Sequence, residues 1–287
     1  MAETILVVGG TGKVGEPVAR RMKAEGYAVR ILTRDPERGR RKFPSGFELV
    51  PGDVDEPSAL ARALEGCSRV HTSLDGQGDW DIERRGAENI AKIAARTGIK
   101  RITHTSGAST CEENAWFPMT RAKLEAENAI RQSGVPFTIF RCTMFMETLL
   151  MMVREGRAMV MGRQPNPWRW VAADDYAAMV ARAHKTDAAV GKTVYVYGPE
   201  PLTMEQALEQ YRAACAPEAR LTRVPFWMLT MIAAFPGRTE LRRIGLPLMR
   251  YFSKVKEQGD AAEADALLGK PTTTLAQWCG ARETRAT

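Results

Sequence analysis

Residues 5–15 read Ile-Leu-Val-Val-Gly-Gly-Thr-Gly-Lys-Val-Gly, an apolar run that leads directly into Gly9, Gly12 and Gly15. This order is typical of a strand, a tight turn and a helix that together bind a phosphate group. Gly9 allows the sharp turn, Gly12 leaves room for backbone to approach a pyrophosphate, and Gly15 lets the helix pack on the strand. Glycine-rich turns also occur without a ligand, but here an amphipathic helix and a second strand follow at the spacing of a βαβ unit. We therefore predict a dinucleotide site at this turn.

The composition predicts a soluble globular protein. The chain has 287 residues, of which 44% are hydrophobic, so it can bury a full core. Its five cysteines are odd in number and widely spaced, which favours a reducing compartment and neither a disulfide framework nor a metal site. The first strand leaves no room for a signal peptide, and the apolar stretch 226–235 is about half of the ~20 residues that a membrane span needs. We expect a cytoplasmic protein without a transmembrane segment.

The formal net charge of +7 is concentrated after the second predicted strand, where residues 34–42 hold four arginines and a lysine. A cofactor's adenosine ribose would lie at this place in a dinucleotide-binding fold, so a small phosphate accounts for the cluster. The alternative is a solvated basic loop. Nucleic acid is not an expected partner, because no aromatic stacking surface or recognition helix accompanies the charge.

Strand and helix patterns alternate through the first half of the chain. The predicted strands are residues 5–8, 28–33, 47–50, 69–72, 101–105 and 137–141. The predicted helices are residues 13–25, 57–64, 82–97 and 120–133. This alternation predicts an α/β fold with a doubly wound parallel sheet, the Rossmann type.

The pattern changes after residue 142. We expect a methionine-rich helix over residues 144–152, a hairpin with its turn at 163–167, a helix over 174–185 and a strand over 193–197. A helix opened by Thr203, a strand over 221–224 and a terminal group of helices complete the prediction. Residues 1–142 would form the Rossmann core, and residues 143–287 a mixed region that completes the sheet and builds a smaller substrate or lid lobe.

Arg34 favours NADP(H) over NAD(H). An acidic side chain at the end of the second strand binds a ribose 2′-hydroxyl, whereas an arginine there accommodates a 2′-phosphate. No carboxylate precedes Arg34, and Asp35-Pro36 is better interpreted as a helix N-cap followed by proline at the first helical position. At the end of the third strand, Asp53 could accept from an adenine amino group while Val54 packs on the ring. A turn with an N-cap at Asp55 is an equally natural reading of that segment.

Lys123 is the best candidate for chemistry. On its predicted helix it shares a stripe with Met119, Ala126 and Ile130, so its amine must either reach solvent or meet a polar partner. A cofactor ribose and nicotinamide at the carboxyl edge of the sheet would be such a partner. The alternative is a surface lysine paired with Glu127, four residues further on. Thr105 and Ser106 end the fifth strand, where hydroxyls face the ligand crevice or cap the next turn.

Apolar side chains flank the expected nicotinamide position. The substrate candidates are Trp116, Met119, Phe145 and Met146. Such a wall suits an apolar or aromatic small-molecule substrate, although ordinary core packing would look the same in the sequence. The three histidines show no metal spacing, and His71 and His104, which fall in predicted strands, favour core roles.

Taken together, the motifs resemble the NmrA-like group of atypical short-chain dehydrogenases/reductases over roughly residues 3–200. The resemblance rests on Gly9–Gly15, residues 33–36, 52–54 and 105–107, Lys123, and residues 140–147. That group includes NADP-dependent quinone, isoflavone and ergot-alkaloid reductases, and also non-catalytic regulators that sense NADP.

The resemblance implies a role for each matching position. Backbone from Thr11 to Val14, including Gly12 and Lys13, would contact the pyrophosphate, Arg34 the 2′-phosphate, and Asp53 and Val54 the adenine. The ribose and nicotinamide would be bound by Thr72, Ser73, Thr105, Ser106, Lys123, Cys142 and Thr143.

Two departures from the family pattern matter. Ordinary short-chain dehydrogenases carry a catalytic tyrosine four residues before the lysine, and this chain has Met119 there, which cannot donate a proton. Cys142 stands where the family usually has proline.

We therefore expect an NADP(H)-dependent reductase of a quinone, enone or imine, with an NADP(H)-sensing regulatory protein as the alternative. An epimerase or dehydratase is disfavoured by Met119. A homo-oligomer or a protein partner would use the C-terminal lobe, in which the sequence leaves open the role of residues 226–252.

Overall fold

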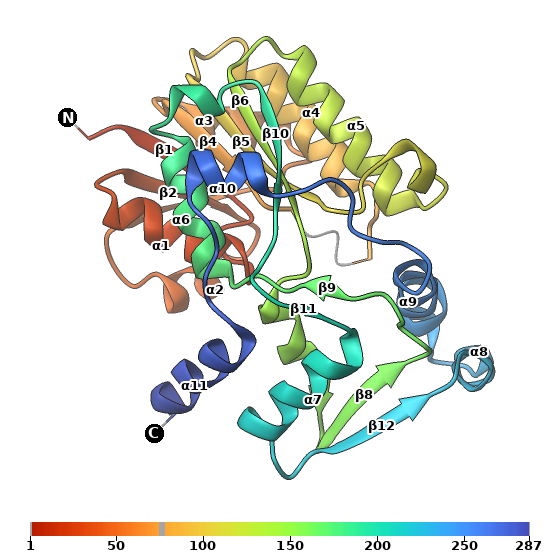
Figure 1. Cartoon of the computed structure of the whole chain (residues 1–287). Helices are drawn as coiled ribbons and strands as arrows, with labels where there is room; N and C mark the ends of the chain where they lie inside the picture. Colours follow the sequence, from red (N-terminus) through yellow and green to blue (C-terminus); the bar gives the residue numbers. More distant parts are fainter. Residues whose placement is uncertain (1, 75–77, 287) are drawn as a thin grey trace. The chain divides into compact units, whose positions relative to one another are not determined.

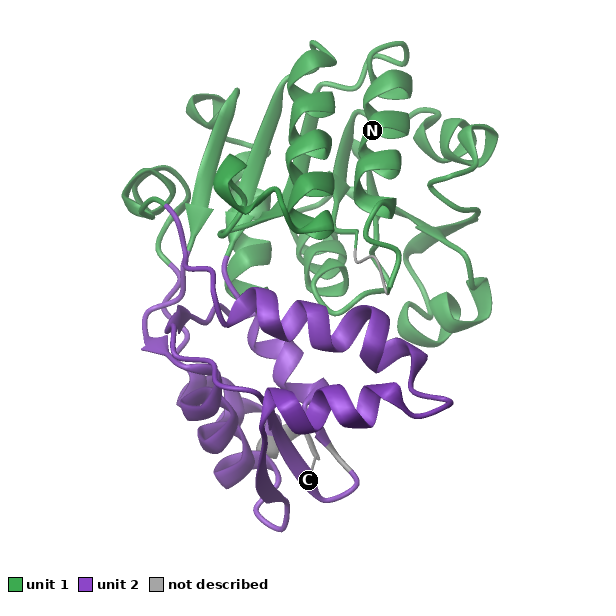
Figure 2. Ribbon diagram, turned by 90° about the vertical axis from the view of Figure 1, so that its right-hand side faces the viewer, with its two compact units in different colours: residues 1–142, 173–196, 259–270 green, residues 143–172, 197–258, 271–287 purple. Residues whose placement is uncertain are grey.

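The computed structural model describes residues 2–74 and 78–286. It divides into two compact units (Figure 2). Unit 1 comprises residues 1–142, 173–196 and 259–270, and unit 2 comprises residues 143–172, 197–258 and 271–287.

Unit 1 is built on a seven-stranded sheet in the order β10-β6-β5-β4-β1-β2-β3, and all neighbouring strands are parallel (Figure 1). The strands are β1 (Thr4–Val8), β2 (Ala28–Thr33), β3 (Phe47–Pro51), β4 (Arg69–Thr72), β5 (Arg101–Gly107), β6 (Phe137–Cys142) and β10 (Lys192–Val196). The predicted Rossmann-type fold is confirmed. The strand order reverses between β1 and β4, and in such sheets ligands bind at the carboxyl ends of the strands beside that reversal.

Helices cover both faces of this sheet. The helices are α1 (Gly15–Ala24), α2 (Pro36–Lys42), α3 (Pro57–Leu64), α4 (Ile82–Ala94), α5 (Pro118–Gln132), α6 (Ala173–Ala183) and α10 (Ala262–Leu268), with 3-10 turns η1 (Glu112–Asn114) and η3 (Asp187–Ala189). Helix α1 packs against α6, whereas α4 packs against both α3 and α5. Helix α2 begins as predicted, with Pro36 in the first turn and the Asp35 carboxylate accepting from the Arg38 N–H at 2.9 Å.

One hydrophobic core lies between the sheet and the layer of α3, α4 and α5. Leu6 and Val8 of β1, Ile90 of α4, and Ala126 and Ile130 of α5 are fully or almost fully buried there. Alternate residues of each strand face opposite layers, so the position of a side chain along a strand decides which helices it meets.

Unit 2 contains two small sheets and several helices. Its strands are β7 (Val153–Arg154), β8 (Arg157–Met161), β9 (Trp168–Arg169), β11 (Pro201–Leu202) and β12 (Arg220–Val224). They form a β12-β8-β7 sheet and a β11-β9 pair. Its helical segments are η2 (Met146–Met151), α7 (Met204–Cys215), α8 (Phe226–Ala234), η4 (Leu241–Gly245), α9 (Leu246–Phe252) and α11 (Leu275–Ala286). The predicted start of α7 is confirmed, because Thr203 and Gln206 form a capping box.

Two expectations for this region are wrong. The methionine-rich helix is only the short 3-10 helix η2. The hairpin turn is Glu155-Gly156, which joins antiparallel β7 and β8, and not residues 163–167. Both turn residues have positive φ, 50° and 69°, the geometry of a two-residue hairpin turn. Strand β8 then pairs in parallel with β12, more than fifty residues later, so residues 163–167 only lead away from it.

No helix in the described ranges is both long and apolar enough to cross a bilayer.

Candidate functional site

The glycine-rich turn after β1 has the geometry that its sequence predicts. Gly9 has φ 80°, and a Cβ on it would lie 2.1 Å from the Ser73 carbonyl oxygen. A Cβ on Gly15 would lie 2.2 Å from the Gly9 carbonyl oxygen, so α1 can start this close to β1 only with glycine. Gly12 is different: it is exposed, and its added Cβ would meet only the Gly9 oxygen at 3.1 Å. Gly12 and Lys13 are therefore exposed beside the N-terminus of α1, where an anion binds favourably, while the Gly12 N–H donates to the Gly9 carbonyl at 2.9 Å.

Arg34 and Asp53 lie together at the carboxyl ends of β2 and β3. The Arg34 Nε lies 3.7 Å from Asp53 Oδ2, and the arginine side chain is 68% exposed. Asp53 also accepts from the Asp55 N–H, whereas helix α3 starts at Pro57 with Glu56 and not Asp55 as its N-cap. Val54 is buried in the core, and its carbonyl accepts from the Asn89 side-chain amide. The Arg34 guanidinium is thus mostly exposed, although a carboxylate lies near it.

The hydroxyls at the ends of β4 and β5 have partners inside unit 1. Thr72 Oγ1 lies 2.6 Å from His104 Nδ1, and Thr105 Oγ1 lies 2.7 Å from the Tyr176 hydroxyl of α6. Ser106 donates to Glu127 Oε1 at 2.7 Å. The Ser73 backbone lies against Gly9, and its N–H donates to the Val8 carbonyl at 3.0 Å. These residues sit at the predicted edge of the sheet, and three of their hydroxyls are held by neighbouring side chains.

Lys123 of α5 binds a buried carboxylate of α4. Its Nζ donates to Glu83 Oε2 at 2.6 Å, and Glu83 Oε1 lies 3.3 Å from His104 Nε2. Burial opposes ionisation of Glu83, but the charge of Lys123 outweighs it with help from His104 and holds the pKa of Glu83 below its ordinary value. Thr72, His104, Glu83 and Lys123 therefore form a continuous polar chain through the α4–α5 side of the sheet.

The stem of Lys123 lies against the end of β5. A Cβ on Gly107 would be 3.5 Å from Lys123 Cδ, so the lysine runs along the backbone of the strand's last residue. Its side chain is 16% exposed. This places a mostly buried ammonium group, fixed by a carboxylate, at the carboxyl edge of the sheet.

Glu127 is not the partner of Lys123, so that alternative is wrong. Glu127 is fully buried and binds Arg141 of β6 at 2.8 Å, Arg131 at 2.7 Å and the Ser106 hydroxyl. Burial opposes its ionisation, but Arg141 holds the pKa of Glu127 below its usual range. Lys123 and Glu127, although four residues apart, each meet a different long-range partner.

The remaining predicted residues have mixed surroundings. In unit 1, Trp116 is 53% exposed and its ring packs on Phe117, which also contacts Trp80. Met119 is half-buried in the first turn of α5. Cys142 ends β6, and burial raises the pKa of its thiol. In unit 2, Phe145 and Met146 are buried, and the Thr143 hydroxyl donates to Glu257.

Sequence reasoning missed Glu83 and the part that His104 plays. Glu83 shares the buried stripe of α4 with Gly86, Ala87 and Ile90, at helical spacing. A carboxylate on such a stripe requires a buried cation, so it could have been noticed and matched with Lys123. The contact of Tyr176 with Thr105 has no comparable signal, because it joins residues 71 positions apart.

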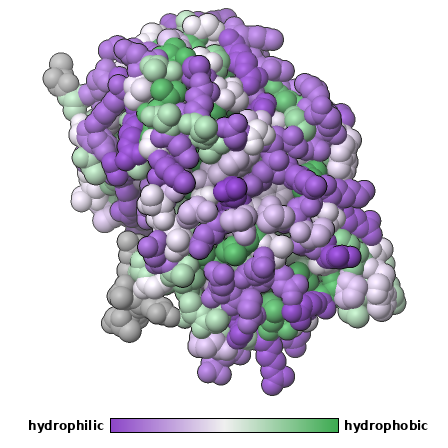
Figure 3. All heavy atoms as spheres, in the orientation of Figure 1, coloured by the Kyte–Doolittle hydropathy of each residue, from purple (hydrophilic) through white to green (hydrophobic). Residues whose placement is uncertain are grey.

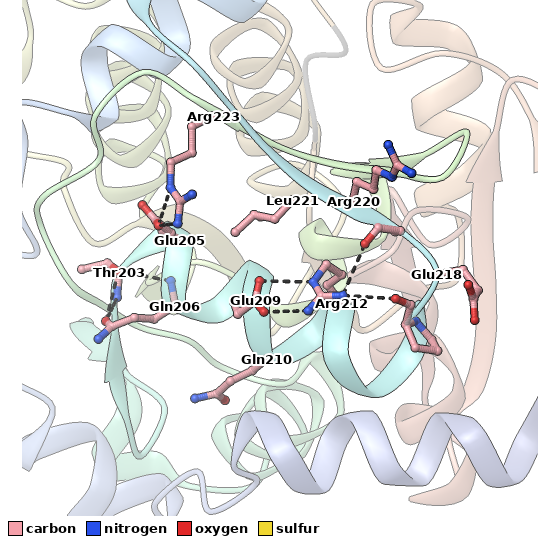
Figure 4. Close-up of a pocket in the computed structure, with 12 residues that line it drawn as sticks. Thr203, Glu205, Gln206, Glu209, Gln210, Arg212, Glu218, Arg220, Leu221 and Arg223 are labelled. Atoms are coloured by element: carbon pink, nitrogen blue, oxygen red, sulfur yellow. Dashed lines mark hydrogen bonds and ion pairs between the residues drawn. The ribbon is translucent and has the colours of Figure 1, made fainter.

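A surface hollow of about 1050 Å³ in unit 2 is not a competing site. It lies between α7 and β12, and none of the cofactor, catalytic or substrate residues predicted from the sequence lines it (Figure 4). Two of its three arginines form local ion pairs, Arg223 with Glu205 and Arg212 with Glu209. Among the described residues, no group of three or more histidine, cysteine, aspartate or glutamate side chains could hold a metal ion.

A doubly wound parallel sheet with a glycine-rich first turn is the fold of dinucleotide-binding proteins of the Rossmann type. Within that class, the model of the NmrA-like family matches residues 1–278. The chain belongs to the NmrA-like family.

Known relatives and solved structures agree with this assignment. A (4-alkanoyl-5-oxo-2,5-dihydrofuran-3-yl)methyl phosphate reductase of Streptomyces griseus subsp. griseus is 34% identical over 209 residues, 72% of each chain. The photosystem II assembly factor Ycf39 of Synechocystis sp. is 24% identical, over 94% of this chain and 88% of its own. The triphenylmethane reductase of Citrobacter sp., solved with NADP(H), shares the fold with a TM-score of 0.77 and 20% identity, over 96% of this chain and 99% of its own.

Proposed function

We propose that this protein is an NADP(H)-dependent reductase of an apolar or aromatic acceptor: a quinone, an enone or an imine. The observation that carries the proposal is the Lys123–Glu83 pair, in which a mostly buried ammonium is fixed at 2.6 Å from a buried carboxylate at the ligand-binding edge of the sheet. A lysine on the surface does not need a buried carboxylate to fix its position. A lysine that holds a ribose hydroxyl in one position does need such a fixed partner.

The residues of unit 1 fit the dinucleotide. Backbone from Thr11 to Val14, in which Gly12 and Lys13 are exposed, would bind the pyrophosphate, and we expect a methyl group at Gly12 to obstruct it. Arg34 would turn from Asp53 to a 2′-phosphate, which gives the preference for NADP(H) over NAD(H). Thr72, Ser73, Thr105, Ser106 and Lys123 would border the ribose and nicotinamide, with Cys142 and Thr143 beside the carboxamide. When bound, the cofactor supplies the hydride.

Methionine in place of tyrosine at position 119 limits the class of acceptor that the site can reduce. Methionine cannot protonate a carbonyl oxygen, so the site suits acceptors that need little acid catalysis. Lys123 would orient the ribose, and water would supply any proton. Trp116, Met119, Phe145 and Met146 are our candidates for an apolar substrate wall. The name of the Streptomyces relative describes a ring double bond conjugated to carbonyl groups, which supports an enone as the acceptor.

The test is NADPH consumption by the purified protein with a panel of quinones, enones and cyclic imines. We expect turnover with at least one class and a loss of at least tenfold in Lys123→Ala. Lys92→Ala, on the exposed face of α4, is the matched control and should keep full activity. NADPH binding in the micromolar range without turnover on any acceptor would overturn the reductase.

A second candidate is an NADP(H)-binding regulatory protein that does no chemistry. The match to an assembly factor over 94% of this chain favours it, as does Met119. Its partner would be a protein bound through the C-terminal region, residues 143–287. The panel of quinones, enones and cyclic imines distinguishes the two candidate functions, because only the reductase consumes NADPH.

A further inference from the structure

Helix α8 of unit 2 exposes an unusual amount of apolar surface. Trp227, Met228, Met231 and Phe235, at the helix or directly after it, are exposed to 63, 38, 59 and 66%. Only three other large hydrophobic side chains in the described part of the chain are comparably exposed: Trp116, Met151 and Val190. In Figure 3, pale and green spheres gather where Figure 1 places α8. Contiguous exposure of this kind marks a binding surface.

The opposite side of α8 is anchored. Leu229 and Ala233 are buried against Val224 and Leu246. The Thr230 hydroxyl accepts from Arg250, whose guanidinium also lies 6.0 Å from the Phe226 ring. The exposed side chains are therefore held outward on a fixed helix and are not a frayed end.

Basic residues follow the apolar face. Residues 236–256 carry six basic side chains and one acidic one: Arg238, Arg242, Arg243, Arg250, Lys254 and Lys256 against Glu240. Arg238, Arg242 and Arg243 are exposed, and they come from the segment that leads from α8 into η4. The surface thus combines an aromatic and methionine face with three exposed arginines that follow it in the chain.

We propose that this surface, the face of α8 with the basic residues 238–243, binds the interface of a membrane that contains anionic lipids. Exposed tryptophan and phenylalanine next to arginines are the composition of helices that lie in the headgroup region. At nine residues, α8 is about 14 Å long and cannot cross a bilayer, but it can lie in the plane of one. An anionic lipid surface attracts the arginines and accepts the apolar face.

A second copy of the chain fits this surface less well. A two-fold contact between α8 helices would bring two arginine clusters together, and like charges repel. One helix face of about 14 by 10 Å is also far below the roughly 800 Å² per partner of a stable interface.

The experiment is co-sedimentation of the full chain with vesicles of phosphatidylcholine alone or with one quarter phosphatidylglycerol. We expect at least tenfold stronger binding to the anionic vesicles. Trp227→Ser/Phe235→Ser should reduce that binding at least tenfold, and Arg242→Gln/Arg243→Gln severalfold. The matched controls are Val190→Ser, an exposed apolar residue elsewhere, and Lys92→Gln/Arg96→Gln, which removes the same charge from α4 and the turn that follows it.

Circular dichroism and thermal unfolding check that each variant is folded. No binding to anionic vesicles by the wild type would overturn the proposal. An equal loss in Lys92→Gln/Arg96→Gln would also overturn it, because that result would indicate attraction by net charge alone. A dimer in sedimentation equilibrium that Trp227→Ser/Phe235→Ser dissociates, without vesicle binding, would assign the surface to a second copy instead.

Discussion

Lys123 Nζ lies 2.6 Å from Glu83 Oε2, and this contact joins the packed helices α5 and α4 beside the end of β5. Both side chains are mostly buried, at 16 and 7% exposure. A buried ion pair adds little net stability, because desolvation offsets much of the attraction, but leaving one charge alone is costly. The pair therefore fixes the position of an ammonium group more than it stabilises the fold.

Removing either charge of this pair should cost more than removing both. We expect Glu83→Gln to lower the free energy of unfolding by about 2–4 kcal/mol, because Lys123 is left without its carboxylate. The double variant Glu83→Gln/Lys123→Met should recover at least half of that loss. Urea unfolding of the two single variants and the double variant gives the coupling. Additive losses would show that the two charges do not depend on each other.

The glycines of the first turn should separate folding from cofactor binding. Gly9→Ala meets a positive φ and the Ser73 oxygen, so we expect a loss of stability of several kcal/mol, or no folded protein. Gly12→Ala adds a methyl group that only the Gly9 oxygen touches, so stability should change by less than about 1 kcal/mol. NADPH binding by Gly12→Ala should nonetheless fall at least tenfold, measured by titration calorimetry. A Gly12→Ala protein that binds NADPH normally would contradict the pyrophosphate assignment.

Arg34 should distinguish the two dinucleotides. We expect Arg34→Ala to weaken NADPH binding by about 1.5–3 kcal/mol, as for a charge-assisted contact, and to leave NADH binding unchanged. Arg38→Ala, which removes another exposed arginine of the same basic segment, serves as the control. Equal losses for both cofactors in Arg34→Ala would remove the 2′-phosphate assignment.

The buried histidine His71 of β4 predicts that the free energy of unfolding depends on pH. His71 Nδ1 lies 2.9 Å from Thr103 Oγ1, which also meets His184, and burial lowers the pKa of His71 to about 3. In the unfolded chain a histidine titrates near pH 6.5, so the unfolded state takes up the proton first. The contribution of His71 is fully present above that pH and is lost as the pH falls toward 3.

His71→Gln tests this dependence, because glutamine can keep a hydrogen bond to Thr103 without titrating. Between pH 7.5 and 5.0, the free energy of unfolding of the variant should fall by about 2 kcal/mol less than that of the wild type. Urea unfolding at the two pH values measures the difference. The same fall in both proteins would mean that His71 stays accessible to protons in the folded state.

Much of unit 1 could be predicted, because its elements are specified by local patterns. The strands β1, β2 and β4 follow from the alternation of strand and helix patterns along the chain and from the turn residues between them. Gly9 and Gly15 have the close approaches to neighbouring backbone that their positions in the motif predict. The hairpin in unit 2 was misplaced because residues 163–167 contain two prolines and resemble a turn, whereas Glu155 is an unusual residue at positive φ.

The partners of the candidate site residues could not be predicted in the same way. Lys123 has a nearby carboxylate in sequence, Glu127, and helical spacing favours that pair. The folded chain instead gives Glu127 to Arg141 and Ser106 and brings Glu83 to Lys123 from 40 positions away. Which of two buried carboxylates meets a given cation depends on how α4 and α5 pack, and no local pattern contains that information.

The most direct test of the proposed function is a single turnover with NADPH deuterated at one face of C4 and an enone acceptor, followed by mass spectrometry of the product. An enone is preferred because deuterium delivered to carbon is retained, whereas deuterium on a quinone oxygen exchanges with water. We predict one deuterium in the product from one of the two labelled forms and none from the other. Unlabelled product from both forms, or no reduced product from any enone, imine or quinone while NADPH remains bound, would contradict the reductase and favour a regulatory protein.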